Sequence, residues 1–249
     1  TGIVALGVLA QWIAWRVKLP AIVLLLAIGI LVGPVFHLLD PDEIFGDLLF
    51  PLTALSVAII LFEGSLTLRF QDIHGLRGPI LNLVTIGAAI NIIIITACAY
   101  YFLEAPIGIA LLIGTIGCVT GPTVVGPMPR AIRPTTAVDK VLRWEGIIID
   151  PIGAILAVIA IEFAIKNNNS EIGWVLGKLV ASGLIIGLLT AAILGILLKR
   201  HLVPWYLRNV ITLGFVILAF TVSDVLAHEA GLLAVTVMGI ALANTPNLD

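Results

Sequence analysis

The chain has 249 residues, of which 60% are apolar and only 11% are charged, and its formal net charge is −2. A soluble domain carries about 25% charged residues, so this composition excludes an ordinary soluble protein and indicates a polytopic membrane protein. The basic residues lie in short loops rather than in one patch, so we expect membrane lipid as a partner and no nucleic acid. Cys98 and Cys118 both lie in apolar runs, which leaves neither a disulfide framework nor a CxxC metal site.

Apolar segments follow one another along the whole chain. About twenty apolar residues cross the hydrocarbon core as a helix. The sequence therefore predicts an all-α polytopic membrane protein with about nine transmembrane helices, one of them broken. The predicted spans are residues 2–16, 20–36, 48–66, 80–103, 106–128, 143–165, 172–198, 205–224 and 230–246.

The loop charges predict the orientation of these spans. Cytoplasmic loops carry an excess of Lys and Arg. The loops after spans one, three, five and seven hold eleven of the thirteen basic residues, namely Arg16, Lys18, Arg69, Arg77, Arg130, Arg133, Lys140, Arg143, Lys199, Arg200 and Arg208. We therefore expect a multi-pass protein of the cell inner membrane with an extracytoplasmic N-terminus.

The chain contains a faint internal repeat. The segment "PAIVLLLAIGILVGP" in span two resembles "AGLLAVTVMGIALAN" in span nine, with Gly29 aligned to Gly239. The two spans run in opposite directions, as an inverted repeat requires. If span eight restarts the pattern of span one, spans three to six lack counterparts and the chain is truncated. The alternative is a chance likeness between two apolar helices.

One acidic residue lies deep in a predicted span. A carboxylate at mid-helix costs roughly 2.5–3.5 kcal/mol on insertion scales, so Asp150 in "RWEGIIIDPIGAILAVIAIEF" indicates a use. Gly146 and Ala154, one turn to either side, leave room for another helix to approach closely. Pro151 lacks an amide hydrogen and frees the carbonyl of Ile147. A carboxylate beside a free carbonyl suits a cation or a proton; the alternative is an aspartate that only hydrogen-bonds to a neighbouring helix.

Two other acidic residues leave their roles open. Glu145 lies about 140° around the helix from Asp150. It either contacts the ion or forms a structural ion pair. The candidate partners are Arg130, Arg143 and a basic residue outside this chain. Glu63, near the end of span three, is either a ligand of the site or a solvated end residue.

The fifth span contains two Gly-Pro pairs, in "GCVTGPTVVGPMPR" (residues 117–130). Each proline removes a helical hydrogen bond. Irregular backbone at membrane depth persists where it lines a cavity or is buried in protein, and Thr120 and Thr123 add hydroxyl groups there. We therefore predict a broken helix beside the acidic site. The alternatives are a simple proline kink and a helix that ends early.

The motifs "LFEGSL", "TGPTVVGPMPR", "RWEGIIIDPIGA" and "HEAGLLAVTVMGIALAN", in this order and spacing, resemble bacterial monovalent cation:proton antiporters of the sodium/proton exchanger family. The resemblance covers essentially the whole chain. It implies a dimerisation domain and an ion-translocating core with broken helices that cross at mid-membrane. It divides the chain into dimerisation-type helices (1–66), half of the core with the acidic site (80–165), and a linker helix with the start of a second repeat (172–249).

The resemblance also assigns roles to residues. It implies that Asp150 binds the cation and the proton alternately, and that Glu145 pairs with an arginine on a later helix. It places Glu63, Thr120 and Thr123 in the surroundings of the ion. Many members of the family have an aspartate where this chain has Gly121, an asparagine at Ile149 and a serine at Gly146. Each departure removes an oxygen from the expected coordination shell.

We therefore expect an antiporter, not an enzyme, that exchanges Na⁺, K⁺ or Li⁺ for H⁺ without a cofactor and forms a homodimer. The alternatives are a cation channel and a non-transporting membrane sensor. The chain contains no TVGYG pore motif, which disfavours a channel. It also contains neither GxSxG nor HExxH, and its four His residues have no metal-ligand spacing.

Overall fold

The computed structural model describes residues 2–17, 21–121, 134–165 and 169–246. Within these ranges all regular elements are helices, which confirms the predicted all-α fold. In the first half they are α1 (Gly2–Val17), α2 (Ala21–Ile30) with the π-helix Leu31–Val35, α3 (Pro41–Phe45), the 3-10 turn Gly46–Leu48, α4 (Leu49–Ser65), the 3-10 turn Phe70–Ile73, α5 (Arg77–Asn82) with the π-helix Leu83–Gly87, α6 (Ala88–Phe102) and α7 (Ile107–Gly117). In the second half they are α10 (Thr136–Ile165), α11 (Asn169–Lys199), the 3-10 turn Trp205–Leu207, α12 (Arg208–Leu226) and α13 (Ala230–Ala243).

The helices supply the predicted membrane spans. Five stretches of the described chain are long and apolar enough to cross a membrane, namely Pro41–Ser65, Arg77–Phe102, Thr136–Ala164, Gly173–Lys199 and Trp205–Leu226. The shorter apolar helices are Gly2–Val17, Ala21–Val35, Ile107–Gly117 and Ala230–Ala243. Within the described ranges, each of the nine predicted spans therefore has its helix.

Two helices differ from the predicted boundaries. The sixth span was expected to begin at residue 143, but α10 begins at Thr136. The extra turns carry an ion pair between Arg143 Nε and Asp139 Oδ2, 3.0 Å apart and one turn from each other. A pair at this spacing supports a helix that continues into water. The fifth span was expected to reach residue 128, but α7 ends at Gly117, and residues 122–133 lie outside the described ranges.

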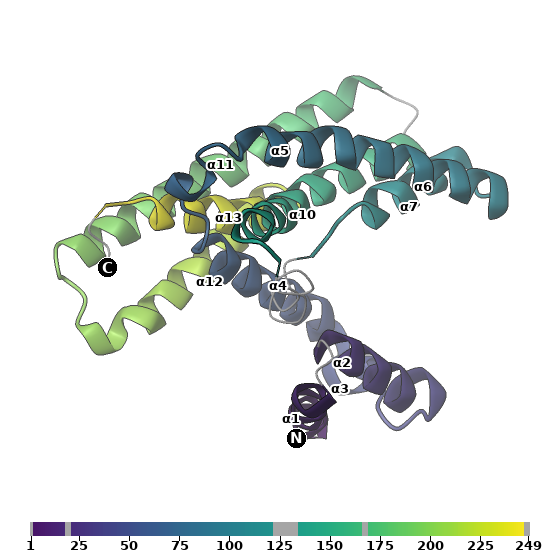
Figure 1. Cartoon of the computed structure of the whole chain (residues 1–249), viewed down its shortest axis with the longest axis horizontal. Coiled ribbons are helices and arrows are strands. Elements are labelled where there is room, and N and C mark those ends of the chain that lie inside the picture. Colours follow the sequence, from purple (N-terminus) through teal and green to yellow (C-terminus); the bar gives the residue numbers. More distant parts are fainter. Residues whose placement is uncertain (1, 18–20, 122–133, 166–168, 247–249) are drawn as a thin grey trace.

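Helix α13 is the centre of the first buried cluster. It packs against α4, α11 and α12 through apolar side chains that include Leu61, Leu194, Val216 and Met238. Figure 1 shows α4, α12 and α13 meeting near the middle of the molecule, with α1–α3 at the lower end of α4. This cluster forms a scaffold of long, closely packed helices.

The second buried cluster surrounds the first half of α10. Trp144, Ile147 and Ile149 of α10 pack against side chains of the loop after α4 and of the α5 region, including Leu68 and Ile80. Helix α7 packs between α6 and α10 and joins the same unit. The described core is therefore divided into a unit around α13 and a unit around α10.

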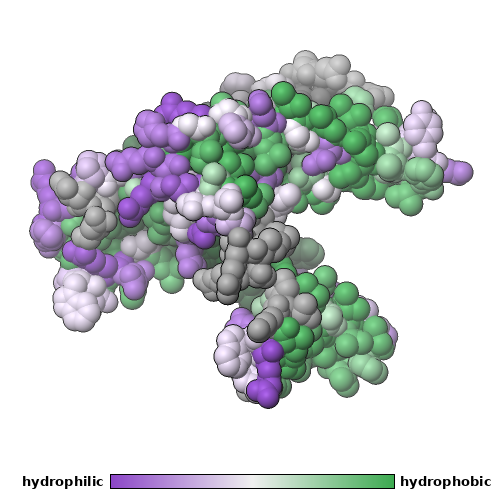
Figure 2. Space-filling model, in the orientation of Figure 1, coloured by the Kyte–Doolittle hydropathy of each residue, from purple (hydrophilic) through white to green (hydrophobic). Residues whose placement is uncertain are grey.

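The surface has the polarity of a membrane protein. Figure 2 shows hydrophilic residues gathered on the left of the view, over the start of α5 and the connection between α11 and α12. The surface over α6 and α7, on the right, is hydrophobic. Large apolar side chains are exposed on α6 and α11, as expected of helices that face lipid. Examples are Ile93 on α6 and Leu189 on α11.

A close crossing joins α4 to α13. A Cβ atom on Gly239 would collide with Ser65 Oγ and would lie 2.9 Å from the carbonyl oxygen of Phe62. Small residues at such crossings allow two helices in a membrane to approach closely, and their association then depends on van der Waals contact. The close approach of the α4 backbone therefore requires a residue without a side chain at position 239.

We expect Gly239→Val to force α4 and α13 apart and to lower the free energy of unfolding by about 1–3 kcal/mol, the usual cost of overpacking. The matched control is Gly214→Val in α12, where an added Cβ meets nothing within 4 Å. Both variants carry the same change in helix propensity, so thermal unfolding in detergent isolates the crossing. Equal unfolding midpoints for the two variants would contradict this account.

Candidate functional site

Asp150 lies near the middle of α10, half-buried, in a helix that contains Pro151. Its neighbours Ile147 and Ile149 are only 4% and 1% exposed and belong to the second buried cluster. Helix α10 is thirty residues long, about 45 Å at 1.5 Å per residue, so both of its ends extend to or beyond the hydrocarbon boundary. The carboxylate is thus held at membrane depth by the packing of its own helix.

Helix α7 runs antiparallel to α10 and ends beside the acidic residue. At one end of the contact, a Cβ on Gly108 would lie 2.7 Å from Ala164 Cβ. At the other end, a Cβ on Gly153 would collide with Val119 Cγ2. Residues three apart are neighbours on a helix surface, so Asp150 lies on the same side of α10 as Gly153, the side that meets the end of α7.

The short length of α7 gives its end a chemical role. Eleven residues span about 16 Å, roughly half of the hydrocarbon core, so the last carbonyl groups of α7 lie at membrane depth. The C-terminal end of a helix carries partial negative charge and favours a cation. Helix α7 therefore directs carbonyl oxygens toward the part of α10 that contains Asp150.

Glu145 is buried and binds the segment that follows α7. The hydroxyl of Thr120 donates a hydrogen bond of 2.7 Å to Glu145 Oε1, and the Glu145 side chain is 8% exposed. Arg143, a candidate partner of Glu145 in the sequence, instead pairs with Asp139. The other candidate in this chain, Arg130, lies outside the described residues.

The remaining predicted site residues are Glu63 and Thr123. Glu63 is exposed on α4, next to Phe62, which faces the scaffold cluster. Thr123 lies outside the described ranges. Among the described residues, no three His, Cys, Asp or Glu side chains are close enough to hold a metal ion together. A cation at Asp150 would need hydroxyl, backbone carbonyl or water oxygens as its other ligands.

The structure also identifies a positioning residue that the sequence analysis did not single out. The expected small-residue groove beside Asp150 was assigned to Gly146 and Ala154, whereas the close approach of α7 is at Gly153, next to Ala154. Gly146 is buried. The available signal was the glycine itself, three residues after Asp150 in an otherwise branched apolar run.

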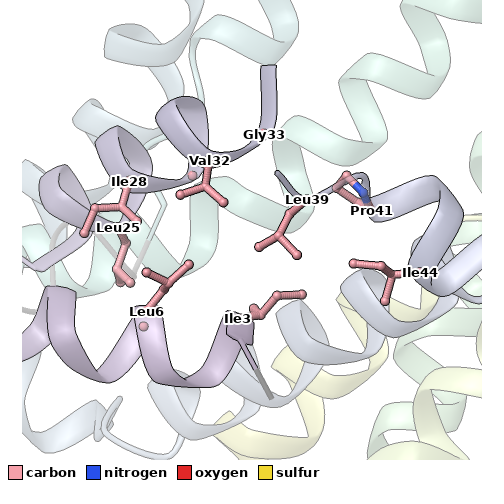
Figure 3. A pocket seen from close by; sticks show the side chains of 11 residues that line it. Ile3, Leu6, Leu25, Ile28, Val32, Gly33, Leu39, Pro41 and Ile44 are labelled. Atoms are coloured by element: carbon pink, nitrogen blue, oxygen red, sulfur yellow. The ribbon is translucent and has the colours of Figure 1, made fainter. Parts of the chain in front are cut away.

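An apolar pocket lies elsewhere in the described structure. It has a volume of about 300 Å³ and lies between α1, α2 and α3, lined by side chains that include Leu6, Ile28, Val32 and Leu39 (Figure 3). Its lining contains no titratable side chain and no residue of α7 or α10. The pocket therefore offers no carboxylate to a cation, and the site around Asp150 remains the chemical candidate.

The chain matches one protein family over nearly its whole length. The family model described as "Sodium/hydrogen exchanger, transmembrane" matches residues 2–248. The chain belongs to the sodium/hydrogen exchanger family. This confirms the resemblance seen in the motifs around Glu63, Thr120, Asp150 and Gly239.

Individual relatives agree with this family. Na(+)/H(+) antiporter 1 of Methanocaldococcus jannaschii is 24% identical over 249 residues, which cover 96% of this chain and 58% of that protein. Na(+)/H(+) antiporter NhaH of Halobacillus dabanensis is 23% identical over 180 residues, which cover 69% of this chain and 43% of that protein. The chain therefore spans less than two thirds of the length of these relatives.

A solved structure has the same fold. The structure of the sodium proton antiporter MjNhaP1 from Methanocaldococcus jannaschii at pH 8 superimposes with a TM-score of 0.83 and 24% identity. The match covers 97% of this chain and 60% of the MjNhaP1 chain. This likeness confirms the predicted antiporter fold for the part of that chain which this sequence spans.

We expect Thr120→Val to destabilise the protein because it leaves the buried Glu145 without its hydroxyl donor. Removing one partner of a buried hydrogen bond costs about 1–3 kcal/mol, and the exposure of Thr120 reduces the expected loss to about 1–2 kcal/mol. The same change in a Glu145→Met background should cost much less, since no acceptor remains. Unfolding of both single variants and the double variant measures this coupling, and purely additive losses would show that the bond contributes nothing.

Proposed function

We propose that the full protein exchanges a monovalent cation, Na⁺ or K⁺, for protons, and that cation and proton compete for the carboxylate of Asp150. The observation that carries this proposal is a carboxylate at membrane depth on the α7-facing side of α10. Membership of the sodium/hydrogen exchanger family and the names of the antiporter relatives support it.

The chemistry follows from the cost of an isolated charge. A carboxylate removed from water is unfavourable unless a proton neutralises it or a cation balances it. The proton and the cation neutralise the same carboxylate charge, so the site holds one or the other. If only the loaded site crosses the membrane, inward movement of one species requires the return of the other, and about one proton moves in the opposite direction for each cation.

The neighbouring groups complete the proposed site. The end of α7 offers carbonyl oxygens, and the Thr120 hydroxyl retains lone pairs for a cation while its proton is donated to Glu145. In this proposal Glu145 supports the site by holding the Thr120 segment against α10. Glu63 and Thr123 stay proposed contributors to the surroundings of the ion.

The two buried clusters suggest how the site changes sides. Repeat transporters commonly move one bundle against another around a fixed site. Here the unit of α5–α7 and α10 would move against the scaffold of α4 and α11–α13, with residues 1–66 contributing to a homodimer. The protein would lie in the cell inner membrane with the N-terminus outside.

Paired helix ends support this arrangement. The loop charges assign residues 66–79 and 129–143 to one side, and the structure joins them through a Lys140–Asp72 ion pair of 2.8 Å. The end of α13, assigned to the same side, binds the same loop through Asn244. The turn that follows α12, assigned to the opposite side, is closed by the Glu229 amide, which donates to Asp224 Oδ1.

We expect Asp150→Asn in the full-length protein to abolish proton movement evoked by Na⁺, K⁺ or Li⁺ in everted membrane vesicles. The amide keeps the shape of the side chain but can neither titrate nor balance a cation. The matched control is Asp47→Asn on the exposed turn before α4, which should exchange as the wild type does. Normal, pH-dependent exchange by a folded Asp150→Asn variant would remove Asp150 from the mechanism. Cation flux without coupled proton movement in the wild type would favour a channel.

A further inference from the structure

Asn244, the residue that ends α13, binds the loop that follows α4. Its Oδ1 atom accepts a 2.7 Å hydrogen bond from the amide of Phe70, and its Nδ2 atom donates to the carbonyl of Leu68 at 2.8 Å. The same Nδ2 atom also donates to Ile240 O within α13, at 2.8 Å. One half-buried side chain thus joins two segments that lie more than 170 residues apart in sequence.

The same loop is attached to α10 by contacts of a different kind. Leu68 and Ile73 are buried in one cluster with Trp144 of α10. The Phe70 ring contacts the Trp144 ring in a tilted arrangement, with ring centroids 5.8 Å apart. Trp144 directly precedes Glu145, so the loop contacts the part of α10 that contains the proposed site.

An ion pair strengthens the attachment of the loop to α10. Lys140 Nζ lies 2.8 Å from Asp72 Oδ1. The hydrogen bond and the charge of Lys140 hold the pKa of Asp72 below its ordinary value, so this carboxylate stays charged at physiological pH. The loop is therefore joined to α10 by a buried apolar cluster, a ring contact and an ion pair.

The two attachments differ in what a movement would break. Separation of the loop from α10 would expose Leu68 and Trp144, which are 1% and 5% exposed. Separation of the loop from α13 at Asn244 would break two hydrogen bonds to backbone groups that water can replace, and would remove the partly buried Ile240 of α13 from the edge of that cluster. The junction at Asn244 is thus the easier one to open.

We propose that Asn244 is a positioning residue for the exchange. It acts as a latch that holds the α4–α5 loop, and through this loop the first half of α10, in one of the two positions of the transport cycle. The inference rests on the proposed function, since it requires α10 to move relative to α13.

Loss of the latch changes a conformational equilibrium rather than the ion site. The apparent affinity for a ligand is reduced by the fraction of molecules in the competent state. Destabilising the latched state therefore raises the apparent KM at the face to which that state opens and lowers it at the other face. A lesion that only loosens the fold would not move the two values in opposite directions.

The test compares Asn244→Ala with its neighbour Thr245→Ala in full-length protein reconstituted in both orientations. The Thr245 hydroxyl donates to Ala241 O, within α13 itself, so its removal leaves the loop untouched. We expect the ratio of the KM values for Na⁺ at the two faces to change about tenfold in Asn244→Ala, as two lost hydrogen bonds allow, and to be unchanged in Thr245→Ala. An unchanged ratio in Asn244→Ala overturns the latch, whereas a wild type without cation-evoked proton flux overturns the proposed function and the latch with it.

A second measurement holds the junction closed with a cross-link, for the case that Asn244→Ala is too unstable to assay. With Cys98 and Cys118 replaced by alanine, the pair Phe70→Cys and Asn244→Cys is cross-linked with a reducible thiol reagent. Cross-linking should arrest exchange and reduction should restore it, while the pair Asp72→Cys and Lys140→Cys should exchange in both forms. The reduced forms test the proposed function by themselves. Full exchange by the cross-linked 70–244 pair overturns the latch.

Discussion

A carboxylate at membrane depth has to be neutralised or balanced, and the arrangement around Asp150 follows from this constraint. Helix α10 fixes the depth of the residue through the buried Ile147 and Ile149, and α7 ends beside it because Gly153 leaves room for Val119. A full-length helix in the place of α7 would use its carbonyl groups in its own hydrogen bonds. A helix that ends half-way brings the partial negative charge of its carbonyl end to membrane depth. In the proposed function, the carboxylate and this helix end together favour positive charge.

The second constraint applies to the proposed exchange, in which the charged site has to change sides without exposing backbone to lipid. Long helices that move as units would satisfy this constraint, and the described core contains two buried clusters of such helices. Helix α13 is fixed to α4 by the crossing at Gly239, while α10 is fixed to the α4–α5 loop through Leu68 and Trp144. Asn244 is the polar link between the units. Its bonds reach backbone groups, so they depend on the position of the loop rather than on the identity of its side chains.

Hydropathy was sufficient to predict the helices, because a bilayer requires long apolar segments. It could not predict where they end: α10 extends to Thr136 through an Asp139–Arg143 pair that belongs to water rather than to lipid. Asp150 was found because a charge in an apolar run is conspicuous. The partner of Glu145 was not found, since Thr120 is 25 residues away and only the antiparallel packing of α7 brings the two together. Asn244 was missed because a polar residue at the end of a span is ordinary in sequence, and its two distant partners are backbone groups that carry no sequence signal.

The competition at Asp150 is tested most directly by counting protons released when a cation binds. Calorimetric titration of the purified full-length protein with Na⁺ or K⁺, repeated in buffers of different ionisation enthalpy, gives this number without any transport assay. The account predicts release of about one proton per bound cation at a pH where the site is protonated, and neither binding nor release in Asp150→Asn. Cation binding without proton release, or unchanged release in Asp150→Asn, would contradict it.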